Sequence, residues 1–543
     1  MGTFDVTLLS IEDLCDKDSF DELGSLIVAG QSQRLSRDEL IKKTPADGLI
    51  GGIGNVNSKV FGEKNSKCCI MSYDYMVLAG TQGGFNHKKT DRLISISKKG
   101  KLPIIFFVEG GGGRPGDVDF YSISSGGLDL PTWSEFSKLS GKVPRISIVS
   151  GNCFAGNAAI AGCSDVIIAT KNSSIGMAGP SMIKEGGLGE YKASEIGPSK
   201  IQYENGVIDI LVKDEKEAVE KAKQYLSYFQ GNKTKWKVGD QNQLNSLIPE
   251  NRKYAYDVSK ILNLVFDENS VLELRGGFAK NLVTAFARIE GKPLGIIANS
   301  TKHLGGAIDG NASDKASRFL QLCNAFNLPI ISFCDTPGFM VGPDHEKLAL
   351  VRKTSRLFIN GANLKTPIIS IVLRKAYGLG AMAMAGGNFH QSYMTLSWQT
   401  GEFGPMGLEA SVELGFKKEL DNTSSNTERK KLYDHLVSQA YEKGKAINAA
   451  SKLEIDEVID PKETRSRISN ALHNYSDQKD EQNFIDSWLK KANKIEIFKG
   501  SKAMLEWQAG KVENPNIWDT IMQFRPSGLR VKPPSYFPAL VAI

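Results

Sequence analysis

Two turns rich in glycine carry the residues of this sequence that are best suited to chemistry. In the later turn, the apolar run 367–373 is followed by Gly378, Leu379 and Gly380, and then by alanines. The run is typical of a strand buried on both faces, and the small residues after it predict a helix. Glycine lets backbone approach a ligand, and the first amides of a helix have no partner within it, so they can donate to an anionic oxygen. The pattern predicts an oxyanion site, although a structural turn with close helix packing accounts for it about as well.

The same pattern occurs earlier in the chain, where the apolar run 144–150 leads into a glycine turn and a second alanine-rich stretch. Three pairs of landmarks keep nearly one offset: Glu109 and Asp335 (226 positions), Gly156 and Gly380 (224 positions), and Gly176 and Gly404 (228 positions). Landmarks that recur in one order and at one spacing predict two copies of one domain.

Strand-like apolar runs alternate with helical patterns in both copies, which favours an α/β fold with crossover connections. Asp214 stands at the start of an amphipathic pattern and is expected to cap a helix. Residues 230–250 are polar and poor in strand formers, so they are the best linker between the copies. We therefore predict an N-terminal domain over 1–235, a C-terminal domain over 236–475 and a strand-poor extension over 476–543, with a helix around 486–498.

Composition limits the classes of function. The 543 residues are 41% hydrophobic and 24% charged, with a net charge of +6, which is too small to argue for nucleic acid but suits an anionic small ligand. The seven cysteines form no C-x-x-C pair and are expected to be reduced core thiols rather than metal ligands or disulfides. The N-terminus lacks a basic signal-peptide region, and no apolar run is long enough to span a membrane. These features favour a cytoplasmic protein, or a protein of the mitochondrial matrix if the source is eukaryotic.

Three charged or titratable residues lie near glycine turns. His87 and Lys88 follow Gly83-Gly84 at the start of a predicted helix, where they either contact a negatively charged ligand or form a solvated surface. Glu109 ends an apolar run beside four glycines. We interpret it as a cap for the next helix rather than a general base, because no partner histidine is evident nearby.

The segment D-Y-M-V-L-A-G-T-Q-G (74–83), with His87 and Lys88 after it, is a distinctive motif of the N-terminal half. It resembles the N-terminal signature of the carboxyltransferase (beta) subunit of biotin-dependent acyl-CoA carboxylases. The C-terminal half matches more closely, in these segments: F-A-R-I-E-G-K-P-L-G-I-I-A-N (286–299), R-F-L-Q-L-C-N-A-F-N-L-P-I-I-S-F-C-D-T-P-G-F (318–339), R-K-A-Y-G-L-G-A (374–381) and I-D-E-V-I-D-P-K-E-T-R (455–465). The resemblance covers residues 45–470 and implies two tandem crotonase-like (ββα superhelix) domains.

The resemblance also implies a reaction, in which a carboxyl group moves from biotin on a carrier protein to the α-carbon of an acyl-CoA. By the same resemblance, the amides of Gly156 and Asn157 would hold one oxyanion and those of Gly380 and Ala381 the other. Substrate contacts would come from ten residues near these turns: His87, Lys88, Gly111, Gly112, Gly113, Arg114, Tyr377, Gly378, Met382 and Ala383. Met382 and Ala383, just after the oxyanion alanine, are the candidates for acyl-chain preference, and no metal is implied.

Departures from the family pattern limit what carries over. The usual D-S-G-G-A-R loop is E-G-G-G-G-R (109–114) here, and Asn157 replaces a glycine. The identity of the acyl-CoA is therefore not assured. No A-M-K-M biotinylation motif and no ATP-binding glycine-rich region is evident, so biotin is expected on a separate chain, a biotin carboxyl carrier protein with a biotin carboxylase, or a fused alpha subunit. The family further implies dimers in which each site joins the two domains of different subunits, assembled into hexamers.

Two other functions stay open from the sequence. A biotin-dependent acyl-CoA decarboxylase subunit would use the same fold, and Asn157 with the altered loop also fits a non-catalytic scaffold. The extension 476–543 has aromatic residues at intervals and is expected to wrap its own subunit, with docking of the biotin carboxylase as the alternative.

Overall fold

The computed structural model describes residues 10–114, 116–119 and 128–475, together with the backbone of three strands between 504 and 532. The chain forms two compact units, residues 1–469 and 470–543. The second unit contains a three-stranded sheet in the order β18-β20-β19, formed by β18 (Met504–Trp507), β19 (Ile521–Arg525) and β20 (Gly528–Lys532). The prediction that residues 476–543 are strand-poor is therefore wrong, and the helix predicted around 486–498 lies outside the described residues.

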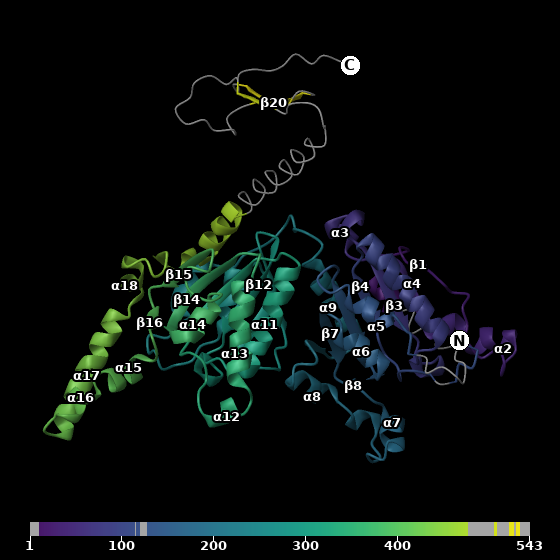
Figure 1. Cartoon of the computed structure of the whole chain (residues 1–543), viewed down its shortest axis with the longest axis horizontal. Coiled ribbons are helices and arrows are strands. Elements are labelled where there is room, and N and C mark those ends of the chain that lie inside the picture. The colour runs from purple at the N-terminus through teal and green to yellow at the C-terminus, as the bar shows by residue number, and fades with distance from the viewer. Residues whose placement is uncertain are drawn as a thin grey trace. The chain divides into compact units, whose positions relative to one another are not determined.

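The first half of the first unit is built on a seven-stranded sheet, shown in Figure 1, which is antiparallel between β2 and β3 and parallel from β3 to β9. Its strands in spatial order are β1 (Asp21–Glu22), β2 (Leu49–Asn55), β3 (Lys67–Tyr73), β4 (Ile104–Phe107), β5 (Arg145–Val149), β7 (Val166–Thr170) and β9 (Ile210–Val212). A separate pair is formed by β6 (Asn152–Phe154) and β8 (Ser174–Gly176). The helices are α2 (Arg37–Lys43), α3 (Ser58–Phe61), α4 (Gly84–Gly100), α5 (Thr132–Ser137), α6 (Gly156–Gly162), α7 (Pro180–Glu185), α8 (Ser199–Glu204) and α9 (Glu215–Ser227).

Strand β4 shows why this sheet is covered on both faces. Its four residues are all apolar and buried, and successive side chains of a strand point to opposite faces. Ile105 joins the cluster that contains Tyr225 of α9, whereas Phe106 joins the cluster that contains Leu93 of α4. Helices α4 and α9 therefore cover opposite faces of the sheet. As predicted, Asp214 caps α9, where its side chain accepts from the amide of Glu217.

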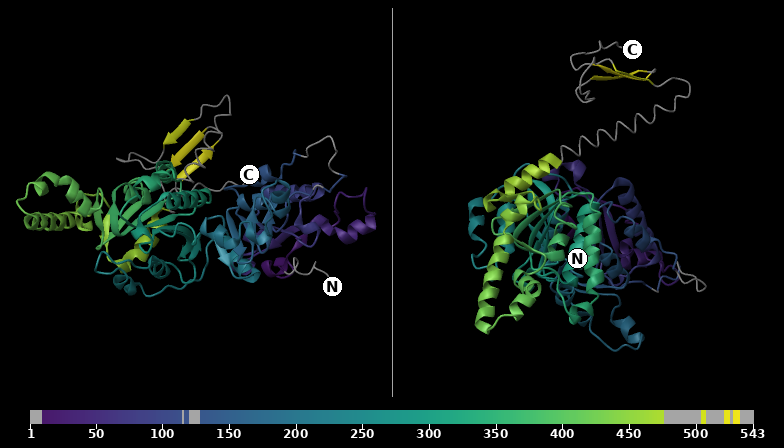
Figure 2. Two further views of the ribbon diagram at one scale, coloured as in Figure 1. Left: turned by 90° about the horizontal axis from the view of Figure 1, so that it is seen from below. Right: turned by 60° about the vertical axis from the view of Figure 1, so that its left-hand side comes forward.

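The second half repeats this plan on an eight-stranded sheet in the order β10-β11-β12-β13-β14-β15-β17, with β16 paired to β14. The strands are β10 (Leu272–Leu274), β11 (Leu282–Ile289), β12 (Lys292–Asn299), β13 (Ile330–Thr336), β14 (Ile368–Tyr377), β15 (Met394–Trp398), β16 (Glu402–Gly404) and β17 (Glu457–Ile459). The helices are α10 (Val258–Val265), α11 (Gly310–Ala325), α12 (Pro343–Glu346), α13 (Leu350–Ala362), α14 (Gly378–Met384), α15 (Leu408–Gly415), α16 (Lys417–Asp421), α17 (Asn426–Lys443) and α18 (Ala446–Ser451). Helices α15, α16 and α17 form an arm at the side of this half (Figures 1 and 2).

Equivalent positions of the two halves confirm the repeat. Gly295 of β12 pairs with Ile330 of β13, and Cys69 of β3 pairs with Ile104 of β4, so each residue of the second pair recurs 226 positions later. The short turns η3 (Leu78–Gly80) and η6 (Leu304–Gly306) keep the same offset. The two halves share a fold even where their sequences differ.

One hydrophobic core joins the two halves. Phe286 of β11 packs against three rings at the end of α9, with ring centroids 5.6 Å from Tyr225, 5.3 Å from Tyr228 and 5.6 Å from Phe229. The same cluster includes residues of both large sheets. The boundary predicted at 235/236 lies between α9 and α10, and it separates the two sheets without separating their core.

Candidate active site

The later glycine turn, called the second elbow (residues 377–381), is built where β14 passes into α14. Gly378 has a φ of +57°, and a Cβ on it would lie 2.8 Å from the carbonyl oxygen of Pro405. A Cβ on Gly380 would lie 2.7 Å from the Cα of Gly338 in the turn after β13. Contacts that short are not found for real side chains, so backbone packs on backbone here. The first amides of α14, which have no partner within the helix, are thus held beside the loop after β13.

The earlier turn, called the first elbow (residues 154–158), joins β6 to α6. Its Ala155 adopts φ 51° and ψ −120°, a conformation that residues with a Cβ rarely take. A Cβ on Gly156 would lie 2.1 Å from Oε1 of Gln82 and 3.1 Å from the ring of Trp133. A Cβ on Gly112, in the loop after β4, would lie 2.5 Å from the Cβ of Ala155. A strained turn kept at this position is the kind of backbone feature found at functional sites.

Each elbow therefore lies against a loop, the one after β4 in the first half and the one after β13 in the second. The two loops occupy equivalent positions in the repeat. In the first half a bridge joins Gln82 to Gly113, and in the second half a bridge joins Ile308 to Phe339. Both members of the second bridge lie 226 positions after those of the first. Gly338 and Phe339 were not among the predicted site residues. The repeat offset is the signal that could have found them, because it maps them onto Gly112 and Gly113.

Asn157 has a larger part in the first elbow than the sequence suggested. It stands where the resembled family has a glycine, and its side chain is fully buried. The amide nitrogen donates to the carbonyl oxygens of Gly80 and Glu109, both at 3.2 Å, and the amide oxygen accepts from the N–H of Gly112 at 3.0 Å. The side chain therefore ties the loop after β4 to the elbow, and the Gly112 amide is already bonded within the protein.

Arg114 is not placed as a free cation for substrate. Its guanidinium is buried and pairs with the carboxylates of Asp47 and Asp117, the latter at 2.8 Å. Burial raises the pKa of Asp47 to about 6, although the Arg114 charge acts in the opposite direction. The two carboxylates hold the end of the Gly110–Arg114 loop in place, so Arg114 supports the loop rather than contacting solvent.

His87 is likewise turned into the protein. Its Nδ1 lies 2.9 Å from the hydroxyl of Thr132, and its ring lies 5.2 Å from that of Trp133, which also contacts the first elbow. Burial, with a smaller contribution from the Arg114 charge, lowers the pKa of His87 to about 4. The ring is neutral near pH 7 and acts as packing behind the elbow. Lys88 is exposed, with its Nζ 5.4 Å from the ring centroid of Phe85.

Glu109 links two strand ends. Its carboxylate accepts from the amide of Ser150 at 2.9 Å, so it joins the end of β4 to the turn after β5. Burial, together with the negative charge of Glu215, raises the pKa of Glu109 to about 7. The prediction that Glu109 caps the next helix is therefore wrong, because the amide that it accepts from belongs to the turn after β5.

A cavity of about 700 Å³ adjoins the second elbow. Gly378 and Met382 line it, whereas Ala383 is buried in the core and Tyr377 is held by a 2.9 Å hydrogen bond from its hydroxyl to Glu402. The remaining wall is mostly apolar and includes Phe389 and Phe403, with helices α15, α17 and α18 supplying its outer side. Of the two residues predicted to influence acyl-chain preference, only Met382 reaches this cavity.

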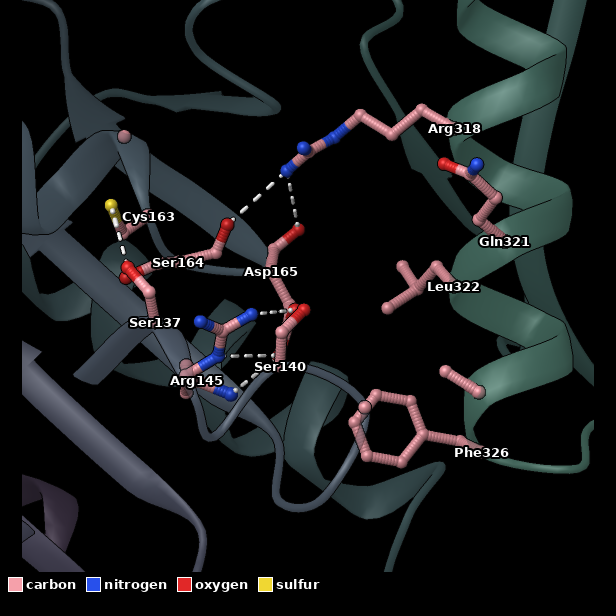
Figure 3. Close-up of a pocket in the computed structure, with 13 residues that line it drawn as sticks. Ser137, Ser140, Arg145, Cys163, Ser164, Asp165, Arg318, Gln321, Leu322 and Phe326 are labelled. Atoms are coloured by element: carbon pink, nitrogen blue, oxygen red, sulfur yellow. Dashed lines mark hydrogen bonds and ion pairs between the residues drawn. The ribbon is translucent and has the colours of Figure 1, made fainter. Parts of the chain in front are cut away.

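A second cavity, of about 330 Å³, lies away from both elbows and is shown in Figure 3. Arg318 of α11 extends across it and donates to the carbonyl oxygens of Ser164 and Asp165, at 3.2 and 3.5 Å. The carboxylate of Asp165 in turn pairs with Arg145 at 2.6 Å. This cavity joins the two halves, and no elbow residue lines it.

Within the described residues, no group of three or more His, Cys, Asp or Glu side chains is placed to hold a metal ion. All seven cysteines are unpaired, and six of them are buried. Among the described helices, none has the length and apolar character that a membrane crossing requires.

Known proteins share this arrangement. A family model described as the carboxyl transferase domain matches residues 5–487. The methylmalonyl-CoA carboxyltransferase 12S subunit of Propionibacterium freudenreichii subsp. shermanii is 30% identical over 483 residues, which cover 86% of this chain and 87% of that protein. A solved single-chain, multi-domain long-chain acyl-CoA carboxylase is 50% identical with a TM-score of 0.81.

That match covers 86% of this chain and 45% of the solved one, so the chain spans less than half of that enzyme. The solved hexameric transcarboxylase 12S, with methylmalonyl-CoA bound, is 28% identical with a TM-score of 0.76, and covers 87% of this chain and 89% of its own. The chain therefore belongs to the carboxyl transferase family, and it is a carboxyl-transferring enzyme with tandem crotonase-like domains.

Proposed function

We propose that this chain moves a carboxyl group from biotin, held on a carrier, to the α-carbon of an acyl-CoA. The observation that carries the proposal is the presence of two elbows, each with helix amides held by close backbone packing against a glycine loop. Removing a proton from the α-carbon of a thioester places negative charge on the thioester oxygen, and transfer from a ureido nitrogen places it on the ureido oxygen. A protein that catalyses this transfer needs two sites for developing negative charge, and the two elbows would supply them.

The elbows suit this task because their donors are fixed before the reaction. A preorganised N–H aimed at a developing oxyanion contributes ~2.7–4 kcal/mol where one donor has been removed in a studied hydrolase. One amide pair, Gly156–Asn157 or Gly380–Ala381, would hold the ureido oxygen of biotin, and the other would hold the thioester oxygen. Bound biotin supplies the carboxyl group that is transferred. The absence of side-chain atoms at Gly156 and Gly380 lets neighbouring protein atoms pack directly against each elbow, which would hold its amides in place.

The cavity beside the second elbow supports an apolar acyl group as the substrate. Met382 and Phe389 present apolar surface, and Lys443, Lys445 and Lys452 are also among its lining residues. Its volume of about 700 Å³ is within the range of small-molecule sites. The match to a long-chain acyl-CoA carboxylase is consistent with an acyl chain longer than two or three carbons. Preference should be graded, because one methylene is worth only ~1–3 kcal/mol in an apolar pocket.

We further propose that the working enzyme is an assembly of several copies. Large apolar side chains are exposed near the second elbow, with Leu379 61% and Val341 81% accessible to solvent. Met177, Met182 and Leu188 are similarly exposed in the segment around α7 of the first half. Surfaces of this kind commonly mark protein interfaces. The solved 12S relative is a hexamer, which is consistent with an assembly that places the first half of one subunit on the second half of another.

The proposal is tested by reconstitution. The purified chain is combined with a biotin carboxylase and biotinylated carrier from the same source, and fixation of ¹⁴C-bicarbonate is measured over acyl-CoAs of increasing chain length. Transfer that depends on ATP, on the carrier and on an acyl-CoA is expected. Calorimetric binding of the acyl-CoA without any transfer would instead indicate a non-catalytic scaffold. Release of carbon dioxide from an added carboxylated acyl-CoA, as the only turnover, would indicate a decarboxylase.

A further inference from the structure

A third cavity, of about 450 Å³, lies at the opposite edge of the sheets from the elbows. Lys67 begins β3, and Lys101 and Lys142 stand just before β4 and β5, which run parallel to it. The elbows and their loops follow the carboxyl ends of the strands, so this cavity is separate from the carboxyl-transfer site. Pro293 at the start of β12 and Leu328 just before β13 line its other side. The cavity therefore lies where the amino-terminal edges of both sheets meet.

One lip of the cavity is positively charged and not neutralised. It carries Lys64 with the three lysines named above, and all four are exposed. None of the four forms an ion pair with a described residue. Acidic residues make up 61 of the 543 residues of the chain, yet none of the described residues that line this cavity is acidic. Four like charges on three neighbouring loops attract an anion and raise its local concentration.

The other lip is apolar and aromatic. Phe229 and Phe326 form an edge-to-face pair with centroids 4.8 Å apart, beside the buried ring of Tyr228. Figure 3 shows Phe326 just beyond the end of α11, where it also lines the 330 Å³ cavity. The site is thus two-sided, with four lysines of the first half on one side and apolar and aromatic side chains from both halves on the other.

The positive character extends into an adjoining cavity of about 250 Å³, which shares Tyr228. Lys223, Lys233 and Arg288 line it, and again none of its described lining residues is acidic. Arg288 is buried and donates to the carbonyl oxygens of Ser227, Gly231 and Gly291, so it is largely committed to the protein. The region that can attract an anion is therefore wider than the four lysines alone.

We propose that the 450 Å³ cavity binds an organic polyphosphate, with its phosphates on the four lysines and its organic group on the apolar lip. Lysine serves as a point charge for phosphate, and a cluster of lysines suits several phosphates better than one carboxylate. The volume is that of a small-molecule site, and such sites occur preferentially between domains. A simple docking surface for an acidic protein is less well supported, because the apolar lip forms a concave wall rather than an exposed patch.

Calorimetric titration of the full chain in magnesium-free buffer tests the proposal, with ATP, inorganic triphosphate and adenosine as probes. ATP is expected to bind more tightly than triphosphate, adenosine should bind least, and ATP binding should weaken in 0.5 M salt. Replacing Lys64, Lys67, Lys101 and Lys142 together by glutamine should weaken ATP binding roughly 10- to 100-fold, since each exposed pair contributes a small share. The matched control replaces four exposed lysines outside the cavity by glutamine (Lys17, Lys200, Lys417 and Lys430) and should bind ATP as the unmodified chain does.

Four results would overturn the proposal. ATP could fail to bind at millimolar concentration, or triphosphate could bind as tightly as ATP, which would remove the role of the apolar lip. The two quadruple variants could lose ATP affinity equally, which would show a general charge effect. The lysine variant could instead keep ATP affinity and lose association with the carrier or carboxylase, which would make the surface a protein-docking site. Thermal melting of both variants checks that each is folded.

Discussion

At the scale of single residues, the candidate site depends on its glycines, which have no side chain, as much as on its polar side chains. Gly380 can lie against Gly338 only because Gly380 carries no Cβ, and Gly112 lies against Ala155 for the same reason. Glycine at such places is readable from a sequence, because the backbone alone demands it. The roles of Asn157, Arg114 and His87 were not readable, because each side chain has a partner tens of residues away in the chain.

We expect Gly380→Val to lower turnover by ~10²-fold or more, the scale of losing an oxyanion donor. A side chain there must displace Gly338 and so move the amides of α14 from the ligand oxygen. The matched control is Gly415→Val at the end of α15, where an added Cβ meets nothing within 4 Å. Kinetics are measured beside melting temperature and oligomer size. If Gly380→Val folds, assembles and turns over normally, the second elbow does not bind an oxyanion.

The structure changes what we expect of Asn157→Gly. From the sequence alone, restoring the glycine of related enzymes should leave activity within about tenfold, because the backbone amide survives. The buried side chain makes three hydrogen bonds, and its loss leaves two carbonyls and one N–H without partners. We therefore expect the free energy of unfolding to fall by about 2–4 kcal/mol and turnover to fall more than tenfold. Denaturant unfolding and kinetics check this, with the exposed Asn422→Gly as the control; unchanged stability would show that these bonds contribute nothing.

At the scale of elements, polar side chains fix the loops that follow the strands at their carboxyl ends. Arg114 anchors the loop after β4 through two carboxylates, and Glu109 ties the end of that strand to the turn after β5. The strands themselves were predicted from apolar runs, because strands buried on both faces need continuous apolar sequence. The polar contacts between strand ends were not predicted, since hydrogen bonds and ion pairs produce no periodic pattern in a sequence.

Glu109 should make stability depend on pH. Its pKa is raised from 4.5 to about 7, so between these values the folded protein holds a proton that the unfolded chain has lost. The stability that this group contributes is present below pH 4.5 and is lost as the pH rises through about 7, a span worth roughly 3 kcal/mol. Glu109→Gln should flatten the dependence of melting temperature on pH across this window. Glu220→Gln, an exposed site on α9, should not, and identical profiles for both variants would contradict the assignment.

At the scale of the whole molecule, the repeat explains why one chain has two elbows. The offset between copies was evident in the sequence because glycine turns recur at one spacing, and the strand pairings confirm it. The common core was not evident, since apolar runs do not show which copy their side chains face. Phe286 and the rings of α9 belong to different copies and pack as one cluster.

We expect the unmodified chain to be oligomeric and Leu348→Glu with Val351→Glu to break the assembly. Both side chains are exposed near α13, in the segment that follows the loop opposing the second elbow. Charges buried at an interface without partners are costly, so subunits should separate and transfer activity should be lost. Analytical ultracentrifugation measures the size, and Leu26→Glu, also on an exposed apolar residue, serves as the control. An assembled but inactive double variant would place the interface elsewhere.

The common core of the two halves also constrains how such a protein can change over time. After a duplication that leaves two separate genes, either gene can be lost or moved without the other. Here each half supplies rings that keep water from the other, so a fragment ending near residue 235 would expose the Tyr225 and Phe229 side of α9. Expressed alone, such a fragment should aggregate, and the halves should recover solubility only when they are produced together. Divergence is then confined to residues within each half, such as Asn157, and the chain persists as one inseparable pair.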